Sequence, residues 1–360
     1  MVSTPESSTT RPDFPYPTLL GLVERYSPSG QEKATVDWLV ERMADLGFGR
    51  AFADPSGNAV GVMGDGPRQV ILLGHIDTVS GEIPVRVEED ILYGRGSVDA
   101  KGPLAAFVDA VAATGALPGW QFVVIGAVEE EGDSNGARSI VEQYRPDFVI
   151  VGEPSRWERI TLGYKGSAWA EITVHQAQAH SASQSESACE QAVALWSAIQ
   201  SWAISYNAGQ ERVFDQLQVS LRGLSSGEDG FEEWACLRVG ARLPLAFPPD
   251  DWYARLEDLA SGAQAQRSGF AIPAYQADKN TLLVRAFLAG IRSAGGQPGF
   301  VLKTGTADLN IVAPAWGCPA LAYGPGDSAL DHTPGEHLQI SEYAQALRVL
   351  ETALKRLCKE

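Results

Sequence analysis

The sequence predicts an α/β fold in which a mixed, mostly parallel sheet is flanked by helices, with an α+β domain inserted into the chain. Short apolar runs separated by segments of helical periodicity indicate the first part, because strands that are apolar on both sides belong to a sheet covered on both faces. The second part follows from a change near Gly163, after which strand patterns alternate between apolar and polar residues, as half-exposed strands do.

The first part of the chain is expected to build the main sheet. A helix is predicted at 31–46, where Val36, Leu39 and Met43 share one face. Continuous apolar runs predict the strands that follow, and helical spacing predicts the helices between them. The expected order is strand 70–73, helix 102–114, strand 122–128, helix 139–144 and strand 148–151.

The middle of the chain is expected to form the inserted domain. Its predicted helices can cover one face of a small sheet. A helix that ends at Ala294, a strand at 319–323 and a helix at 341–357 then return to the first pattern. We therefore expect one domain from residues 1–162 and 276–360, interrupted by a second at 163–275. The elements expected in the second domain are strand 168–174, helix 187–206, strands 213–224 and 236–245, and helix 252–260.

The charge of the chain excludes several kinds of partner. Its 28 Lys and Arg residues against 45 Asp and Glu residues give a net charge of −17, which repels phosphate backbones and anionic membranes. No apolar run approaches the roughly 20 residues that span a membrane, and the first residues lack the apolar stretch of a secretory signal. We expect a cytoplasmic protein that binds neither nucleic acid nor membranes.

Histidine and carboxylate side chains follow the predicted strands. His75, Glu131 and Glu153 each come at or after the end of an apolar run, and Asp99 and His332 lie in loops rich in glycine or proline. All five are expected just beyond strands of one sheet, where ligands gather in α/β folds. Mixed imidazole and carboxylate ligands suit zinc, cobalt or manganese. Together the five residues predict a site for two divalent ions, with one carboxylate bridging them.

Two further carboxylates lie beside these candidates. Glu130 precedes Glu131 in a run of three glutamates, and a carboxylate next to a metal ligand can act as a general base on water. Asp77, two residues after His75, can orient the imidazole. Taken singly, each segment is also consistent with a structural histidine or a solvated acidic turn, so the prediction depends on their combination.

Five motifs then point to a family. GHIDTV, GRGSVDAKG, EEEG, GEPS and DHTPGEHL, in this order and over nearly the whole chain, resemble the M20 family of two-metal peptidases and deacylases. Within the family, the chain looks most like a branch that releases lysine or ornithine from an amino-group carrier protein. Most other members read DMKGG where this chain has DAKGP at 99–103.

The resemblance implies a role for each residue of the predicted centre. Asp99 would bridge the two ions, and the peptide bond after it would be cis. His75 would bind one ion with Glu153 or Glu131. His332 would complete the other site, and which ligands surround which ion stays open.

The resemblance also implies catalytic and substrate-binding residues. Glu130 would be the general acid and base, and Asp77 would hold the imidazole of the first histidine. The inserted domain would be a lid that also forms a dimer, and His180 would reach across that dimer to stabilise the carbonyl oxygen of the substrate. Residues of the lid and of a C-terminal loop would bind the substrate: Arg242, Lys303, Thr304 and Gly305.

The activity implied by the resemblance is amide hydrolysis in lysine and arginine biosynthesis. Lysine, or ornithine, would be released from the γ-carboxyl group of the terminal glutamate of an acidic amino-group carrier protein of the LysW type. The cofactors would be two zinc or cobalt ions, with manganese as an alternative, and the protein would be a homodimer or a higher homo-oligomer. Because this chain is itself acidic, an acidic carrier needs a local basic patch, for which the candidates are Lys165, Arg212, Arg238 and Arg242.

Other functions stay open at this point. Deacylation of acetylornithine or a related N-acyl amino acid is the first alternative, and a di- or aminopeptidase is the second. A non-catalytic binding protein of the same family would have lost Glu130 or a metal ligand, and a two-metal phosphoester hydrolase usually needs more histidines than the five present. Lysine and ornithine differ by one methylene, worth about 1–3 kcal/mol in an apolar pocket, and no residue decides between them.

Overall fold

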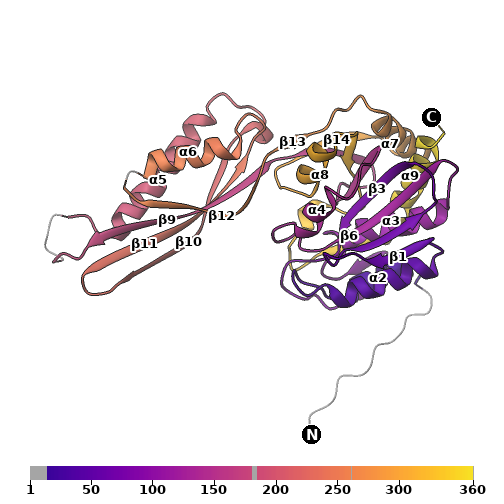
Figure 1. Cartoon of the computed structure of the whole chain (residues 1–360), viewed down its shortest axis with the longest axis horizontal. Helices are drawn as coiled ribbons and strands as arrows, with labels where there is room; N and C mark the ends of the chain where they lie inside the picture. Colours follow the sequence, from indigo (N-terminus) through magenta and orange to yellow (C-terminus); the bar gives the residue numbers. More distant parts are fainter. Residues whose placement is uncertain (1–13, 181–184, 261, 360) are drawn as a thin grey trace, which may run out of the picture.

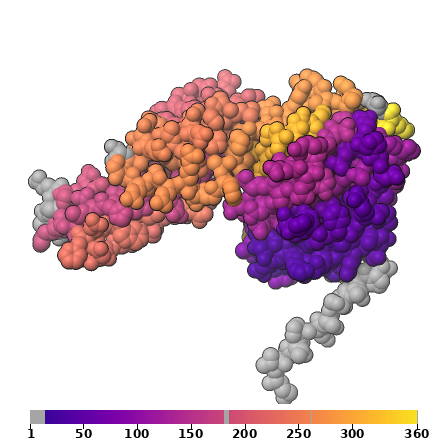
Figure 2. Space-filling model, in the orientation of Figure 1, coloured from indigo at the N-terminus to yellow at the C-terminus, as the bar shows by residue number. Residues whose placement is uncertain are grey.

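The structure is a computed structural model that describes residues 14–180, 185–260 and 262–359. Figure 1 shows an α/β body and a narrower region, coloured from magenta to orange, that extends from it. The space-filling view in Figure 2 shows the same narrower region projecting from the body. Within the described ranges, no helix is both long and apolar enough to cross a membrane.

A nine-stranded sheet forms the centre of the body and confirms the predicted mixed, mostly parallel sheet. Its order is β1-β2-β6-β3-β7-β15-β8-β13, with β14 also paired to β8. The middle strands β6, β3, β7 and β15 are mutually parallel, and the antiparallel pairs lie toward the edges. The strands are β1 (Arg50–Ala53), β2 (Ala59–Met63), β3 (Arg68–His75), β6 (Trp120–Ala127), β7 (Phe148–Gly152), β8 (Arg159–Tyr164), β13 (Tyr275–Gln276), β14 (Gly299–Lys303) and β15 (Ala320–Ala322).

Helices cover both faces of this sheet, as the continuous apolar runs predict. Successive side chains of a strand point to opposite faces, so Val70 and Leu72 pack in one core cluster while Ile71 and Leu73 pack in the other. The first face carries α1 (Pro17–Val23), α2 (Lys33–Asp45), α3 (Lys101–Thr114), α7 (Leu282–Ser293) and α9 (Ile340–Leu357). The second carries α4 (Asn135–Ile140) and α8 (Leu309–Trp316).

The projecting region is a separate antiparallel sheet with two helices, and we call residues 166–272 the lid. Its strand order is β10-β11-β9-β12, and both helices pack on one face of the sheet through a core of their own. The lid lies within the predicted segment 163–275, whose exact boundaries stay a prediction. Its elements are β9 (Gly166–Ala177), α5 (Ala188–Tyr206), β10 (Gln218–Glu228), β11 (Glu232–Leu243), α6 (Pro249–Ala260) and β12 (Gln264–Ile272).

A third, three-stranded sheet brings two distant loops together. It has the order β16-β5-β4, from β4 (Arg86–Glu88), β5 (Ile91–Tyr93) and β16 (His337–Gln339). The register pairs His337 with Tyr93. Consequently the loop that precedes β16 lies beside the loop that follows β5, and these two loops carry two of the predicted metal ligands.

Several predicted elements are displaced in the structure. The helix predicted at 139–144 is α4, which begins earlier because the Asn58 side chain binds the carbonyl of Gly136 and docks its first turn. The strand predicted at 213–224 begins at Gln218, since Val213–Asp215 forms a 3-10 turn. The strand predicted at 236–245 is β11, which starts and ends earlier. Several strands without a long apolar run, β12 of the lid among them, were not predicted.

Candidate metal centre and active site

Four of the five predicted metal ligands lie at or beyond one end of the strands of the main sheet. His75 is the last residue of β3, and Glu131 and Glu153 follow β6 and β7. His332 lies in the loop after β15, next to the 3-10 turn Ser328–Leu330. The prediction is wrong for Asp99 in one respect. Asp99 follows β5 of the small three-stranded sheet and leads into α3. The small sheet places the loop after β5 at the end of the main sheet, so Asp99 still reaches the other ligands.

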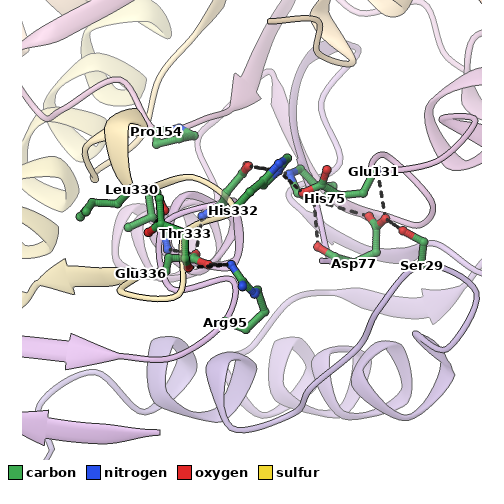
Figure 3. A network of polar contacts seen from close by, with 12 residues as sticks. Ser29, His75, Asp77, Arg95, Glu131, Pro154, Leu330, His332, Thr333 and Glu336 are labelled. Carbon is green, nitrogen blue, oxygen red and sulfur yellow. Dashed lines mark hydrogen bonds and ion pairs between the residues drawn. The ribbon is translucent and has the colours of Figure 1, made fainter. Parts of the chain in front are cut away.

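Asp99 lies between two histidines. Its Oδ1 atom is 3.3 Å from Nε2 of His75, and its Oδ2 atom is 3.1 Å from Nε2 of His332. The same nitrogen of His332 is 2.9 Å from Oε1 of Glu131. Figure 3 shows the two imidazoles approaching each other, that of His75 from the end of β3 and that of His332 from a loop. The peptide bond after Asp99 is cis, as the resemblance implies.

The chemistry of these side chains fits divalent metal ions. Ligand atoms of His75, Asp99 and Glu131 all lie within 4.8 Å of one another. Burial, followed by repulsion from Asp99, raises the pKa of Glu153 to about 8. Hydrogen bonds to the carboxylates of Asp99 and Glu131 raise the pKa of His332 to about 10. The predicted ligands are three carboxylates and two imidazoles, and bound divalent cations would balance the charge of the ionised carboxylates.

Asp77 ties the first ligand to the loop after β6. Nδ1 of His75 is 3.0 Å from the backbone oxygen of Asp77 and 3.4 Å from its carboxylate. That carboxylate also accepts hydrogen bonds from the backbone N–H groups of Glu130 and Glu131 and from the hydroxyl of Ser29. The contacts, visible in Figure 3, fix the imidazole and the glutamate loop relative to each other, which extends the orienting role predicted for Asp77.

Among the three consecutive glutamates, Glu130 and Glu131 line the same cavity as the metal ligands. Burial, with the negative charges of Asp308 and Glu153, raises the pKa of Glu130 well above its usual range. Glu129 instead does not line this cavity, and its half-buried side chain accepts a hydrogen bond from Asn135. Its φ of +61° starts the turn that sends the next two side chains into the cavity.

Glu336 is a buried carboxylate that sequence reasoning missed. Its Oε1 atom accepts hydrogen bonds from the backbone N–H groups of Val98 and Asp99, and its Oε2 atom accepts one from Arg95 at 2.8 Å. Arg95 in turn donates to the carbonyl of Thr333. Figure 3 shows this network beneath the histidine pair. Glu336 thus joins the loop of His332 to the loop of Asp99.

A cavity of about 830 Å³ opens beside the metal ligands, between the body and the lid. All four predicted substrate-binding residues line it: Arg242, Lys303, Thr304 and Gly305. Nη1 of Arg242 donates to the hydroxyl of Thr306 at 2.7 Å, which joins β11 of the lid to the loop after β14. The ammonium of Lys303 donates to the backbone oxygen of Pro154. The cavity also contains Asp331, whose burial and whose proximity to Asp99 raise its pKa to about 9.

His180 lies away from this cavity. It is exposed, beyond the end of β9, and does not belong to the described residues that line the cavity. The two residues after it in the predicted motif, 181 and 182, lie outside the described residues. Its predicted role across a dimer therefore stays a prediction.

The expected basic docking patch does not form as proposed. Lys165 is fully buried and donates to the carbonyl of Gln216, while Arg212 is held by Asp215 in a two-bond ion pair. Arg238 and Arg242 do lie together, as lining residues of the cavity. The sequence could not separate these cases, because burial and pairing of a cation depend on residues that are distant in sequence.

The comparison with known families decides the classification. A model of the peptidase family M20/M25/M40 matches residues 71–356. The chain belongs to this family. It is 46% identical to a LysW-lysine hydrolase of Deinococcus radiodurans over 92% of this chain and 93% of that protein. A relative from Thermococcus kodakarensis, provisionally named a LysW-lysine/LysW-ornithine hydrolase, is 41% identical over 93% of this chain and 90% of that protein.

A solved structure of the family supports the fold over 95% of the chain. The M20 family metallo-carboxypeptidase Sso-CP2 from Sulfolobus solfataricus aligns with a TM-score of 0.77 at 17% identity. The alignment covers 95% of this chain and 99% of that one, so it includes the lid as well as the body. The alignment shows that this M20 member has the same two-region fold, while the family and the named relatives make it a hydrolase.

Proposed function

We propose that this chain is a metal-dependent amide hydrolase that releases lysine, or ornithine, from the γ-carboxyl group of the terminal glutamate of a LysW-type amino-group carrier protein. The observation that carries the proposal is the 46% identity, over 92% of the chain, to a protein with the name LysW-lysine hydrolase. The Thermococcus relative supports ornithine as a second leaving amino acid. Because this release would be a step of lysine or arginine biosynthesis, we place the enzyme in the cytoplasm.

We assign two divalent ions, zinc or cobalt with manganese as an alternative, to the five predicted ligands. Asp99 would bind both, because its two oxygens face different imidazoles. His75 and Glu153 would hold one ion with it, and His332 and Glu131 would hold the other. When bound, such ions lower the pKa of water and polarise a carbonyl group.

Glu130 is our candidate for the general acid and base. Its carboxylate would take the proton of the attacking water and then pass it to the α-amine of the departing lysine. Two observations support this role: the side chain lines the cavity beside the ligands, and its backbone N–H is held by Asp77. A carboxylate in this position can accept a proton from water and return it to the leaving amine.

The carboxylates of the substrate would be bound by Arg242, Lys303, Thr304 and Gly305. Thr306 holds one N–H of Arg242, which fixes the direction in which the guanidinium presents its other donors. A planar guanidinium suits a carboxylate because it can donate two parallel hydrogen bonds. Together with Arg238, these residues give the cavity three cations, and an acidic carrier tail could enter there even though the whole chain is acidic.

A homodimer formed through the lid is the assembly we propose. The outward face of α5 is exposed and uncharged over several turns, at Val193, Ala194, Ser197, Ala198, Ser201 and Ile204, although the chain as a whole carries a charge of −17. His180 is exposed on the same lid. In such a dimer, His180 of the partner subunit would stabilise the negative charge that develops on the scissile carbonyl oxygen.

Parallel activity assays with two substrates test the proposed function. Purified enzyme loaded with zinc or cobalt is incubated with carrier protein bearing γ-glutamyl-lysine, and in parallel with N-acetylornithine, with and without a chelator. We expect metal-dependent release of lysine from the carrier, measured by mass spectrometry of the carrier and by amino-acid analysis. The Glu130→Gln variant, purified in the same way, controls for contaminating peptidases.

Each outcome of this test has a definite meaning. Release from the carrier, with little turnover of N-acetylornithine, supports the proposal. Turnover of N-acetylornithine alone would keep the amide chemistry and overturn the carrier substrate in favour of an acetylornithine deacetylase. Turnover of neither would contradict the proposal and favour a peptidase or a non-catalytic binding protein.

A further inference from the structure

The cavity contains more charged groups than the proposed chemistry uses. Four of its six carboxylates are proposed metal ligands or the proposed base, which leaves Asp133 and Asp331. Three cations of the cavity, Arg238, Arg242 and Lys303, suit the carboxylates of the substrate. The two remaining acids therefore need a different explanation, and Asp331 is the one whose surroundings point to a ligand.

Asp331 has a buried acceptor without a donor. Its Oδ1 atom is shielded from solvent, and no described residue donates a hydrogen bond to it. Nor does Asp331 form an ion pair within 4 Å of any described cation; the ammonium of Lys303, which also lines the cavity, donates to the backbone oxygen of Pro154. By contrast, Asp77 and Glu336, which support the metal centre, each accept several hydrogen bonds.

The missing partner must bring hydrogen-bond donors and positive charge. A buried carboxylate oxygen that loses its contact with water and gains no donor is unfavourable by an amount comparable to a strong hydrogen bond. A primary ammonium supplies both donors and charge, and it can approach the carboxylate of Asp331 from the cavity, because this side chain is only half-buried and lines the cavity. A lysine joined to the carrier through its α-amine still has a free ammonium at the end of its side chain. Its α-carboxylate would instead be bound by the cations of the cavity.

We propose that Asp331 binds the side-chain ammonium of the departing amino acid and thereby selects a cationic residue over an uncharged one of the same length. This inference rests on the proposed function and adds the residue that recognises the side chain of the departing amino acid. Asp331 directly precedes His332 in the chain. The side chain of the substrate would therefore lie alongside the loop that carries a proposed metal ligand, close to the bond that is cut.

The test compares two carrier substrates that differ by one ammonium group. One carrier bears γ-glutamyl-lysine and the other bears γ-glutamyl-norleucine, which has the carbon chain of lysine without the ammonium. Wild-type holoenzyme should prefer lysine by about 10- to 100-fold in kcat/KM, as expected for a charge-assisted contact. Asp331→Asn should lose most of that preference by reacting more slowly with lysine, while its rate with norleucine changes little.

Two controls separate recognition from damage to the metal centre. Asp133→Asn removes the other spare carboxylate of the cavity and should keep the preference for lysine. The metal content of Asp331→Asn should equal that of the wild type. If Asp331→Asn slows both substrates equally, or keeps the preference, the proposed role of Asp331 is wrong while the proposed function stands. If wild-type enzyme releases neither amino acid, the proposed function fails, and this inference fails with it.

Discussion

Glu130→Gln should lower kcat for lysine release by about 10²- to 10⁴-fold, the usual contribution of a general acid or base, while the metal content stays the same. Glutamine has nearly the same shape as glutamate, but its amide cannot accept a proton from water and return it to the leaving amine. Steady-state kinetics with the carrier substrate and elemental analysis of the purified protein measure the two quantities. The position of Glu130 in the cavity beside the ligands is the structural reason for this expectation.

Glu129→Gln is the matched control, because it makes the same chemical change one residue earlier. The Glu129 side chain contacts Asn135 and does not line the cavity, so this variant should keep most of the activity. A fully active Glu130→Gln enzyme would contradict the assignment. If Glu129→Gln were inactive instead, the base would have to be assigned to that residue.

The Glu130→Gln variant also tests whether His180 of the partner subunit contributes to the active site. In a mixed dimer of Glu130→Gln and His180→Ala chains, one of the two sites combines an intact Glu130 with an intact His180. Random mixing of the two inactive chains should therefore restore about one quarter of wild-type activity if the enzyme is a dimer that shares its sites. Mixing that restores nothing would contradict the role of His180 across the dimer.

Replacing Glu336 should weaken metal binding although Glu336 is not proposed to touch a metal. Glu336→Ala removes the acceptor of the backbone N–H groups of Val98 and Asp99 and leaves Arg95 without its carboxylate. We expect a loss of about 10- to 100-fold in metal affinity, as for other groups that orient ligands. Glu336→Gln should lose less, because one side-chain oxygen can still accept from both N–H groups. Competition with a chromogenic chelator measures the affinity.

Glu342 provides a comparison for this effect. Its Oε1 atom also accepts two backbone N–H groups, from Trp157 and Gly326, but none of these residues is a proposed ligand. Glu342→Ala should thus lower the thermal midpoint without changing metal affinity. Excess metal should restore activity to Glu336→Ala if Glu336 acts by positioning Asp99. If excess metal restores nothing, or if both variants lose metal equally, Glu336 has only a general structural role.

The sequence predicts best where a residue is specified by its neighbours in the chain. The strand that ends at His75 is apolar on both sides because helices cover both faces of the sheet, so its apolar run predicts both the strand and the fold class. The motifs predict which residues gather, since each motif lies in a loop at the end of an element. The three-stranded sheet has no such signal, and the position of Asp99 beside it was therefore missed.

Long-range contacts explain the rest of what the sequence could not predict. Glu336 and Asp99 are 237 residues apart, and nothing near Glu336 in the chain indicates that its carboxylate will hold that loop. Similarly, Lys165 is a cation by sequence but a buried hydrogen-bond donor in the fold. A basic patch or a supporting carboxylate forms only where particular loops meet. The local sequence pattern around each residue does not determine which loops meet.

The central claim, that five side chains of this chain hold two ions which amide hydrolysis requires, is tested most directly by metal titration. Enzyme stripped by chelator is titrated with zinc or cobalt while lysine release from the carrier and bound metal per chain are followed together. We predict no activity without metal and full activity at about two ions per chain, the number that bridging by Asp99 implies. Full activity with no bound metal, or a plateau at one ion, would contradict the two-metal centre.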